Sequence, residues 1–229
     1  AAIGSIRATD QHEGGFTRIP IFFVLGNHDF YHGSFENVRQ RVSERLGPKH
    51  NAHYLHQRHT MRLNDRWAIA GVDGNADARH GLFDGRRTIE RVWLNDFNYI
   101  AEYRGLSRDS VRKMMEELGD VAAKRGKKLI EEAWYQGYAN LVFLTHVPPF
   151  RDAATYNGKP SDENYTPFFT CKAMGDMMIE TMAGYPDRKL LVLCGHSHGK
   201  STIQPAPNIE VRTGGAMYGK PELQEDVVL

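Results

Sequence analysis

The sequence predicts an α/β fold, because three short apolar runs each end in a polar cluster and are separated by segments with helical spacing. The runs cover residues 19–25, 141–144 and 190–194. Each run is continuous and does not alternate with polar residues, which is typical of a strand that is buried on both faces of a sheet. Ligands of open α/β sheets bind beyond the carboxyl ends of such strands. We therefore expect a functional site where the polar clusters follow the runs.

The segments between the runs favour helices. Residues 34–46 predict a helix that has Ser34 as its N-cap and is stopped by the Gly-Pro pair that follows. Residues 109–138 have helical apolar spacing and predict two helices that break near Gly126. Residues 171–182 predict a methionine-rich helix, and we assign its methionines to the core.

Three further segments predict strands, and one predicts a loop. The strands are expected at residues 53–63, 67–72 and 209–213. Residues 150–170 predict a long polar loop directly after the second apolar run. A loop of about 20 residues inside a compact domain is usually functional or disordered, so this loop is expected to border the site.

The composition favours one globular domain over residues 1–229. Hydrophobic residues make up 41% and charged residues 25%, with a net charge of +1. Such a charge gives no strong field toward nucleic acid or anionic membranes. No apolar stretch approaches the ~18–20 residues that span a bilayer, so we expect no membrane partner. Two cysteines favour a reducing, cytoplasmic location over a disulfide framework.

Three strand ends carry side chains that suit a metal ion. Residues 26–29 (Gly-Asn-His-Asp), 145–149 (Thr-His-Val-Pro-Pro) and 195–199 (Gly-His-Ser-His-Gly) follow the three apolar runs. Neutral imidazole suits Zn, Mn and Fe, and an amide oxygen adds a ligand. The glycines around the third cluster permit a sharp bend that brings both of its histidines to one side. One cluster alone could be structural or a surface loop, but three that all supply His or Asn indicate a site.

In this order, the three motifs resemble those of the calcineurin-like metallophosphoesterase superfamily. The resemblance covers the chain from about Ile19 to Tyr218, including the segments 70–74 (Ala-Gly-Val-Asp-Gly) and 213–216 (Thr-Gly-Gly-Ala). It implies a four-layer α/β/β/α sandwich. It also implies an enzyme that hydrolyses a phosphate mono- or diester with two divalent metal ions, Mn, Zn or Fe, and a metal-bridging hydroxide as the nucleophile.

The resemblance assigns four metal ligands. Asn27, His146 and His196 would bind the second ion, and His198 would bind the first.

The resemblance also assigns two catalytic residues. His28 would lie near the leaving-group oxygen, as a general acid or as a stabiliser of the transition state. Asp29 would accept a hydrogen bond from His28 and hold its tautomer.

The sequence departs from the family pattern at its start. That pattern opens with a strand that ends in Asp-x-His and continues with Gly-Asp-x-x-Asp, which supply the other ligands of the first ion and the bridging carboxylate. Only 25 residues precede Gly26, and Asp10-Gln11-His12 matches Asp-x-His without a buried strand before it. We therefore expect an N-terminally truncated domain whose first ion keeps only His198.

The substrate stays open among phosphomonoesters, diesters such as a cyclic nucleotide, and phosphopeptides. Tyr156 and Tyr165 could stack on a base or an aryl group and Lys159 could meet a phosphate, with a solvated loop as an equal alternative. No feature favours nucleic acid as a partner. The alternative function is a non-catalytic, phosphoesterase-like scaffold, against which the His28-Asp29 pair argues.

Overall fold

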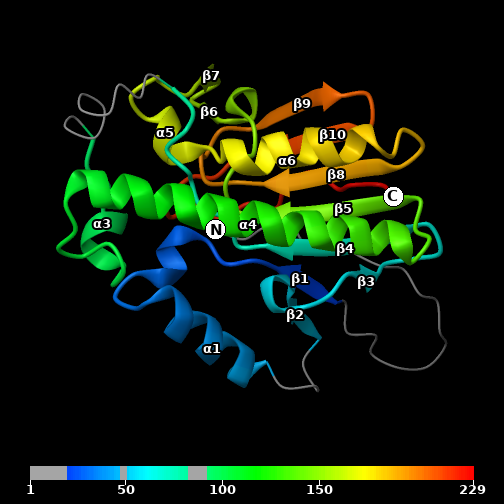
Figure 1. The fold of residues 1–229 in the computed structure, drawn as a ribbon, viewed down its shortest axis with the longest axis horizontal. Coiled ribbons are helices and arrows are strands. Elements are labelled where there is room, and N and C mark those ends of the chain that lie inside the picture. The colour runs from blue at the N-terminus through cyan, green and yellow to red at the C-terminus, as the bar shows by residue number, and fades with distance from the viewer. Residues whose placement is uncertain (1–19, 47–50, 82–91) are drawn as a thin grey trace.

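The computed structural model describes residues 20–46, 51–81 and 92–229, which are built around a six-stranded mixed sheet with the order β3-β4-β5-β8-β10-β9 (Figure 1). The four central strands are parallel: β4 (Trp67–Val72), β5 (Asn140–Thr145), β8 (Lys189–Cys194) and β10 (Ile209–Thr213). The two edge strands are antiparallel to their neighbours: β3 (Met61–Arg62) and β9 (Ser201–Ala206). The predicted α/β class is confirmed.

Two helices cover one face of this sheet, α4 (Arg108–Tyr135) and α6 (Lys172–Ala183) (Figure 1). Leu141 and Phe143 of β5 share a hydrophobic core with these helices, whereas Val142 and Leu144 belong to a second core on the opposite face. Successive side chains of a strand point to opposite faces. The continuous apolar run of β5 therefore reflects burial on both faces, as predicted.

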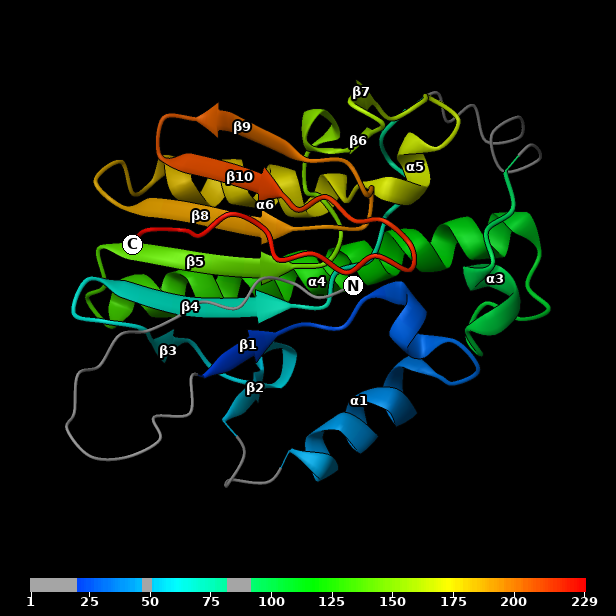
Figure 2. The ribbon, with the colours of Figure 1, turned by 180° about the vertical axis from the view of Figure 1, so that it is seen from behind.

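The second core joins the large sheet to a two-stranded parallel sheet formed by β1 (Ile21–Phe23) and β2 (Ala52–Tyr54). The first apolar run thus forms a strand outside the sheet that contains the other two runs. The C-terminal segment crosses the same face of the large sheet (Figure 2) and packs there through Val227 and Leu229. Buried side chains of this core include Phe22, Val24, Leu55, Ile69, Val142, Leu144 and Leu191.

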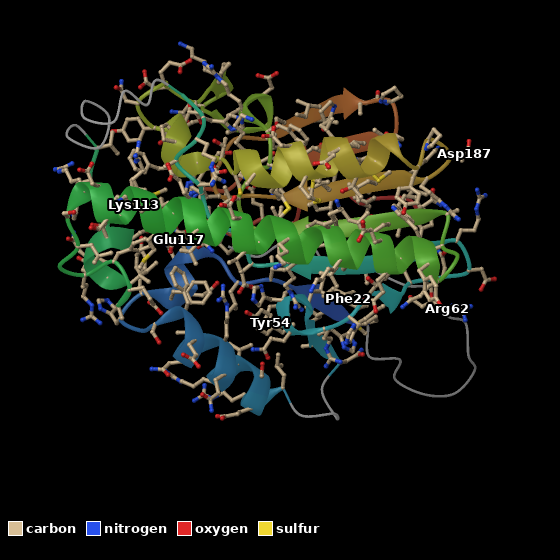
Figure 3. All side chains as sticks on the ribbon, in the orientation of Figure 1. Phe22, Tyr54, Arg62, Lys113, Glu117 and Asp187 are labelled. Carbon is tan, nitrogen blue, oxygen red and sulfur yellow. The ribbon has the colours of Figure 1, made fainter. Side chains whose placement is uncertain are left out.

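The prediction that two helices break near Gly126 is wrong, because α4 continues for 28 residues. A Cβ atom at Gly126 would lie 3.0 Å from Met177 and 3.3 Å from Phe143. The glycine therefore lets α4 pack closely on α6 and β5, and this packing outweighs its cost of about 1 kcal/mol in a helix. The outer side of α4 carries exposed Lys113 and Glu117 (Figure 3). Within the described ranges, no helix is long and apolar enough to cross a membrane.

The other helix predictions agree with the structure. The helix α1 spans Phe35–Arg45, and Ser34 caps it by accepting a hydrogen bond from the Asn37 amide at 3.1 Å. The expected Gly-Pro stop at residues 47–48 lies outside the described residues. All four methionines of α6 are buried, as their assignment to the core requires: Met174, Met177, Met178 and Met182.

The predicted single strand at residues 53–63 is wrong. The chain leaves the small sheet after β2, makes a 3-10 turn η2 (Leu55–Gln57), and joins the large sheet as β3. Two contacts hold this turn. Leu55 is buried in the second core, and His56 Nδ1 accepts a hydrogen bond from the Asp73 amide at 3.0 Å.

The predicted loop at residues 150–170 contains more structure than expected. It holds a 3-10 turn η3 (Arg151–Ala153), a hairpin of β6 (Thr155–Tyr156) and β7 (Lys159–Pro160), and the short helix α5 (Thr166–Phe169). The hairpin turns at Asn157 and Gly158, with φ angles of 49° and 72°. Two successive positive φ angles in an Asn-Gly pair are typical of a type I′ hairpin turn.

Candidate metal site

The site lies where β4, β5 and β8 end, and main-chain hydrogen bonds fix these ends relative to one another. The amide of His146, which follows β5, donates to the carbonyl of Asp73, which follows β4, at 2.8 Å. The carbonyl of His146 accepts from the amide of Gly195, which follows β8, at 2.9 Å. The three strand ends therefore hold His146 in a defined place, and its side chain is buried.

Asn27, His146 and His196 bring their polar atoms together. The Nε2 atom of His146 is 3.0 Å from Oδ1 of Asn27 and 3.1 Å from Nδ1 of His196. Two ligand atoms of one ion, with bonds of about 2.1 Å, lie about 3.4 Å apart at a tetrahedral angle and about 3.0 Å apart at an octahedral angle of 90°. The two observed spacings from His146 are therefore close to those of atoms that bind a single metal ion.

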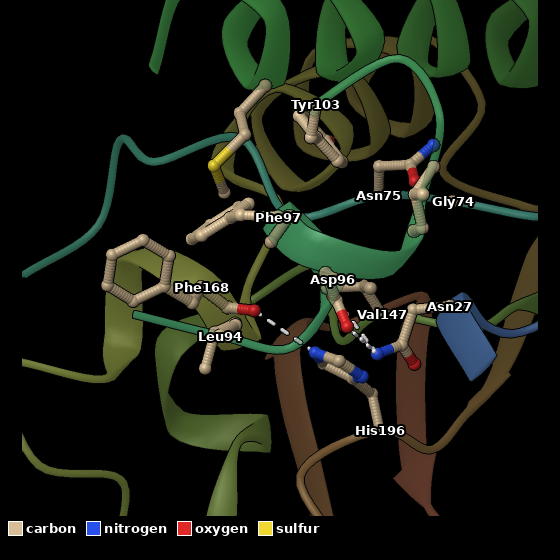
Figure 4. Close-up of a pocket in the computed structure, with 13 residues that line it drawn as sticks. Asn27, Gly74, Asn75, Leu94, Asp96, Phe97, Tyr103, Val147, Phe168 and His196 are labelled. Atoms are coloured by element: carbon tan, nitrogen blue, oxygen red, sulfur yellow. Dashed lines mark hydrogen bonds between the residues drawn. The ribbon is translucent and has the colours of Figure 1, made fainter. Parts of the chain in front are cut away.

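Two of these groups are oriented by a partner on their other side (Figure 4). The Nε2 atom of His196 lies 3.0 Å from the Phe168 carbonyl oxygen, which can only accept, so Nε2 carries the proton and Nδ1 keeps its lone pair. The Nδ2 group of Asn27 donates to both carboxylate oxygens of Asp96, at 2.8 and 3.0 Å. The Oδ1 atom of Asn27 therefore faces His146. Hydrogen bonds of this kind commonly hold metal ligands in place.

Asp96 is a site residue that the sequence did not reveal. It begins the short helix α3 (Asp96–Tyr99) and also accepts a hydrogen bond from the Tyr31 hydroxyl at 2.5 Å. Burial and the neighbouring Asp96 raise the pKa of Tyr31 well above its usual value, so the phenol stays protonated and donates. Asp96 lies 69 residues from Asn27 in a segment without a motif, so no sequence signal pointed to it.

The Gly-His-Ser-His-Gly segment makes the expected sharp bend. His196 and His198 both have φ angles of 66°, in the left-handed region, and Ser197 between them is buried. A non-glycine residue held there costs about 1–3 kcal/mol. The bend points His196 toward His146, while the ring of His198 packs edge-on against Tyr218 at 4.8 Å.

Asn27 and His28 lie on a 3-10 turn, η1 (Asn27–Phe30), that Asp29 closes. The carboxylate of Asp29 accepts a hydrogen bond from the Gly26 amide at 2.8 Å. The predicted hydrogen bond from His28 to Asp29 stays a prediction, and the contact that the structure gives to this carboxylate is the one with Gly26. The turn directs Asp29 back to its own N-terminus, where free amides need acceptors. His28 is exposed, and its ring lies 4.7 Å from that of Tyr31.

The surroundings of three imidazoles, those of His146, His196 and His198, favour their neutral form. Burial lowers the pKa of His146, and the nearby imidazoles lower it further. Burial also lowers the pKa of His196, although the Phe168 carbonyl and Asp96 act in the opposite direction. Burial and the neighbouring His28 also lower the pKa of His198. Neutral imidazoles keep a lone pair free for a metal ion, and protonated ones do not.

A second missed residue, Asp73, supports the site from behind. Its buried carboxylate accepts hydrogen bonds from the amide of Leu25 at 2.9 Å, from Arg39 at 2.9 Å and from the hydroxyl of Tyr54 at 2.7 Å. Leu25 immediately precedes the Gly-Asn-His-Asp motif, so Asp73 ties that motif to the end of β4. Here the sequence did contain a signal, since Asp73 directly follows an apolar run, as the other site residues do.

The space behind the ligands is nearly filled. A cavity of about 20 Å³ lies there, and its lining includes Asn27, Asp96, Phe168 and His196 (Figure 4). That volume holds about one water molecule and is far below the roughly 300–1,000 Å³ of a small-molecule pocket. His28, which follows Asn27 on η1, is exposed instead.

In the part of the chain that the structure describes, no three His, Cys, Asp or Glu side chains form a group that could hold a metal ion. The cluster described above instead combines two imidazoles with an amide oxygen. The weakly matching Asp10 and His12 lie outside the described residues. Comparison with models of known protein families gives no match, and comparison with curated protein sequences gives none either.

Proposed function

We propose that the chain is a metal-dependent phosphoesterase of the calcineurin-like kind, which hydrolyses a phosphate mono- or diester. One observation carries the proposal: Nε2 of His146 lies 3.0 Å from Oδ1 of Asn27 and 3.1 Å from Nδ1 of His196, and the three residues come from three separate motifs. Their spacing, neutral charge and fixed orientation fit the ligands of one divalent ion.

In this proposal, Asn27, His146 and His196 hold one ion, and His198 contributes to a second. Imidazole nitrogen with amide oxygen suits Mn, Zn or Fe better than Ca. Two such ions supply positive charge for the phosphoryl oxygens and an activated water at neutral pH. The chain's own part is to orient the ligands through Asp96 and the Phe168 carbonyl.

His28 is the proposed proton donor to the leaving group. It follows Asn27 directly on η1, and it lies on the exposed side from which a substrate approaches. Asp29 and Asp73 keep this turn in place through the amides of Gly26 and Leu25. A positioned acid of this kind contributes about 10²–10⁴-fold to the rate.

For the fold, we propose a single domain over residues 1–229 with the four layers of an α/β/β/α sandwich. The support is the second hydrophobic core, which lies on the sheet face opposite α4 and α6. A sheet with two apolar faces needs a covering layer on each, and β1, which pairs with β2, contributes Phe22 to the second core.

The test is hydrolysis of 4-nitrophenyl phosphate and bis(4-nitrophenyl) phosphate with Mn, Zn or Fe, by the protein expressed from its complete gene. Metal content is measured in parallel. We expect metal-dependent hydrolysis, with metal and activity both lost in His196→Ala and both kept in Lys113→Ala, a control on the outer side of α4. If the metal-loaded protein hydrolyses neither ester, the function is wrong and the scaffold alternative gains support.

A further inference from the structure

Four rings follow one another along the exposed side of the candidate metal site. The ring of His28 lies 4.7 Å from Tyr31 on one side and 6.0 Å from Tyr218 on the other, and Tyr218 in turn lies 4.8 Å from His198. The His28 and Tyr218 rings are nearly parallel, at 11°. The row therefore leads from the proposed proton donor to a proposed metal ligand.

Tyr218 is held in this row although its side chain is 73% exposed. It occupies a tight turn in which the Lys220 amide donates to the Met217 carbonyl at 3.1 Å and Gly219 has a φ of +74°. This pattern is typical of a type II turn. The Ala216 amide fastens the turn to the site by donating to the His198 carbonyl at 3.1 Å. Core packing does not explain an exposed ring that the backbone holds against two histidines of the site.

Two more exposed tyrosines border the same site. Tyr156 follows Thr155 on β6, and the Thr155 carbonyl accepts a hydrogen bond from the amide of Gly199, which directly follows His198, at 2.9 Å. Tyr165 packs against Phe169, and the Phe169 ring lies 4.8 Å from that of His196. Tyr156 is 58% exposed and Tyr165 is 48% exposed. We call Tyr31, Tyr156, Tyr165 and Tyr218 the aromatic rim.

We propose that the aromatic rim binds an aromatic ring on the leaving group of the substrate, as in an ester of a nucleoside. This inference rests on the proposed function, because it assigns the substrate class of that site. Flat, exposed rings bind nucleobases by stacking, with little dependence on base identity. The 6.0 Å between His28 and Tyr218 is too narrow for a third ring, which needs roughly 7–8 Å. The substrate ring therefore stacks on the exposed part of the Tyr218 ring, beside the proposed proton donor.

The experiment measures binding by calorimetry, so that its result does not depend on turnover. The ligands are non-hydrolysable phosphonate analogues of adenosine 5′-monophosphate, ribose 5-phosphate and phenyl phosphate, added to the metal-loaded protein. The first two differ only in the base. We expect the adenosine compound to bind about 5- to 150-fold more tightly than the ribose compound, the range that stacking of one base supplies.

Variants locate the effect. Tyr218→Ala should remove most of the advantage of the adenosine compound and leave the ribose compound unchanged, whereas Tyr218→Phe should keep it. Tyr135→Ala, which removes a 93% exposed tyrosine at the end of α4, serves as the control and should change neither. If the phenyl compound exceeds the affinity of the ribose compound by as much as the adenosine compound does, the rim still binds aromatic leaving groups and the natural ester is a simple aryl ester.

Equal affinity of the adenosine and ribose compounds for the parent protein would overturn the inference, as would an adenosine advantage that survives in Tyr218→Ala. Failure of the rim and failure of the proposed function are distinguishable. Hydrolysis of nitrophenyl esters without an adenosine advantage refutes the rim alone, and an adenosine advantage without hydrolysis of any ester refutes the proposed catalysis alone.

Discussion

Gly26 leaves little room for an added atom beside the imidazole of His146. Its φ of −97° and ψ of 170° are open to any residue, so Gly26→Ala strains no backbone angle. The new Cβ would lie 2.7 Å from Cε1 of His146 and 3.0 Å from both ring nitrogens, whereas ordinary contacts begin at 3.4 Å. The ring must therefore move by about 0.7 Å or the chain must yield. Overpacking of this kind costs about 1–3 kcal/mol, which lowers the Tm of a chain of this size by roughly 2–12 °C.

A double-mutant cycle with His146→Ala isolates this contact. Urea denaturation of the four proteins gives the free energies of unfolding. When the imidazole is absent, Gly26→Ala should cost less than about 0.5 kcal/mol, because nothing then obstructs the methyl group. Gly195→Ala is the matched control, since its Cβ would meet only the His146 carbonyl oxygen at 4.0 Å. If Gly26→Ala destabilises both backgrounds equally, the cost does not come from the imidazole and the reasoning is refuted.

Three further predictions follow from the contacts of the site. Asp96→Asn should weaken metal binding about 10- to 100-fold in a metal titration, because the new amide no longer forces Oδ1 of Asn27 to face His146; unchanged affinity would contradict this role. His28→Ala should lower kcat/KM more for an alkyl ester than for a nitrophenyl ester, which needs little protonation, and should keep the metal content; equal losses on both esters would remove the general-acid role. Burial lowers the pKa of His56 from 6.5 to about 4, so the unfolded chain binds this proton at a higher pH than the folded one. The contribution of His56 to the free energy of unfolding is therefore full above pH 6.5 and falls by up to about 3 kcal/mol as the pH drops to 4. Urea denaturation across this pH range should show that His56→Gln loses less of its free energy of unfolding than the parent protein does. An identical loss in both proteins would count against this prediction.

The parts of the site that follow buried strands could be predicted from the sequence. The runs before His146 and His196 are continuous because β5 and β8 are buried on both faces, and parallel strands end on the same side of a sheet. This rule predicts that both imidazoles lie at the same edge of the sheet. Asn27 also lies beside these imidazoles, although the strand before it, β1, belongs to a different sheet, so the rule alone does not explain its place.

Other features depend on contacts that a sequence does not display. A glycine inside a helical pattern predicts a break, and only the contacts of Gly126 with Met177 and Phe143 show why the helix continues there. The partnership of Asp96 with Asn27 joins residues far apart in the chain, and a lone aspartate carries no local signal. The hairpin at Asn157 and Gly158 is different, because an Asn-Gly pair between two short segments does predict one.

The hydrogen bonds behind the three ligands bear on whether the cluster is merely structural. The Phe168 carbonyl takes the only proton of neutral His196, so Nδ1 is an acceptor. The carboxylate of Asp96 accepts from the Nδ2 group of Asn27, so the atom of Asn27 that faces His146 is Oδ1, which can only accept. Both acceptors face a single atom, Nε2 of His146, which carries one proton at most. One proton shared between two acceptors leaves buried hydrogen-bonding capacity unused, which is costly. In a purely structural network, turning the Asn27 amide or the His196 ring round would present a donor to His146 and add a hydrogen bond. A cation in place of the proton would instead be bound by the lone pairs of all three groups. The outer partners thus hold the cluster in the arrangement that serves a metal ion better than it serves the ion-free protein.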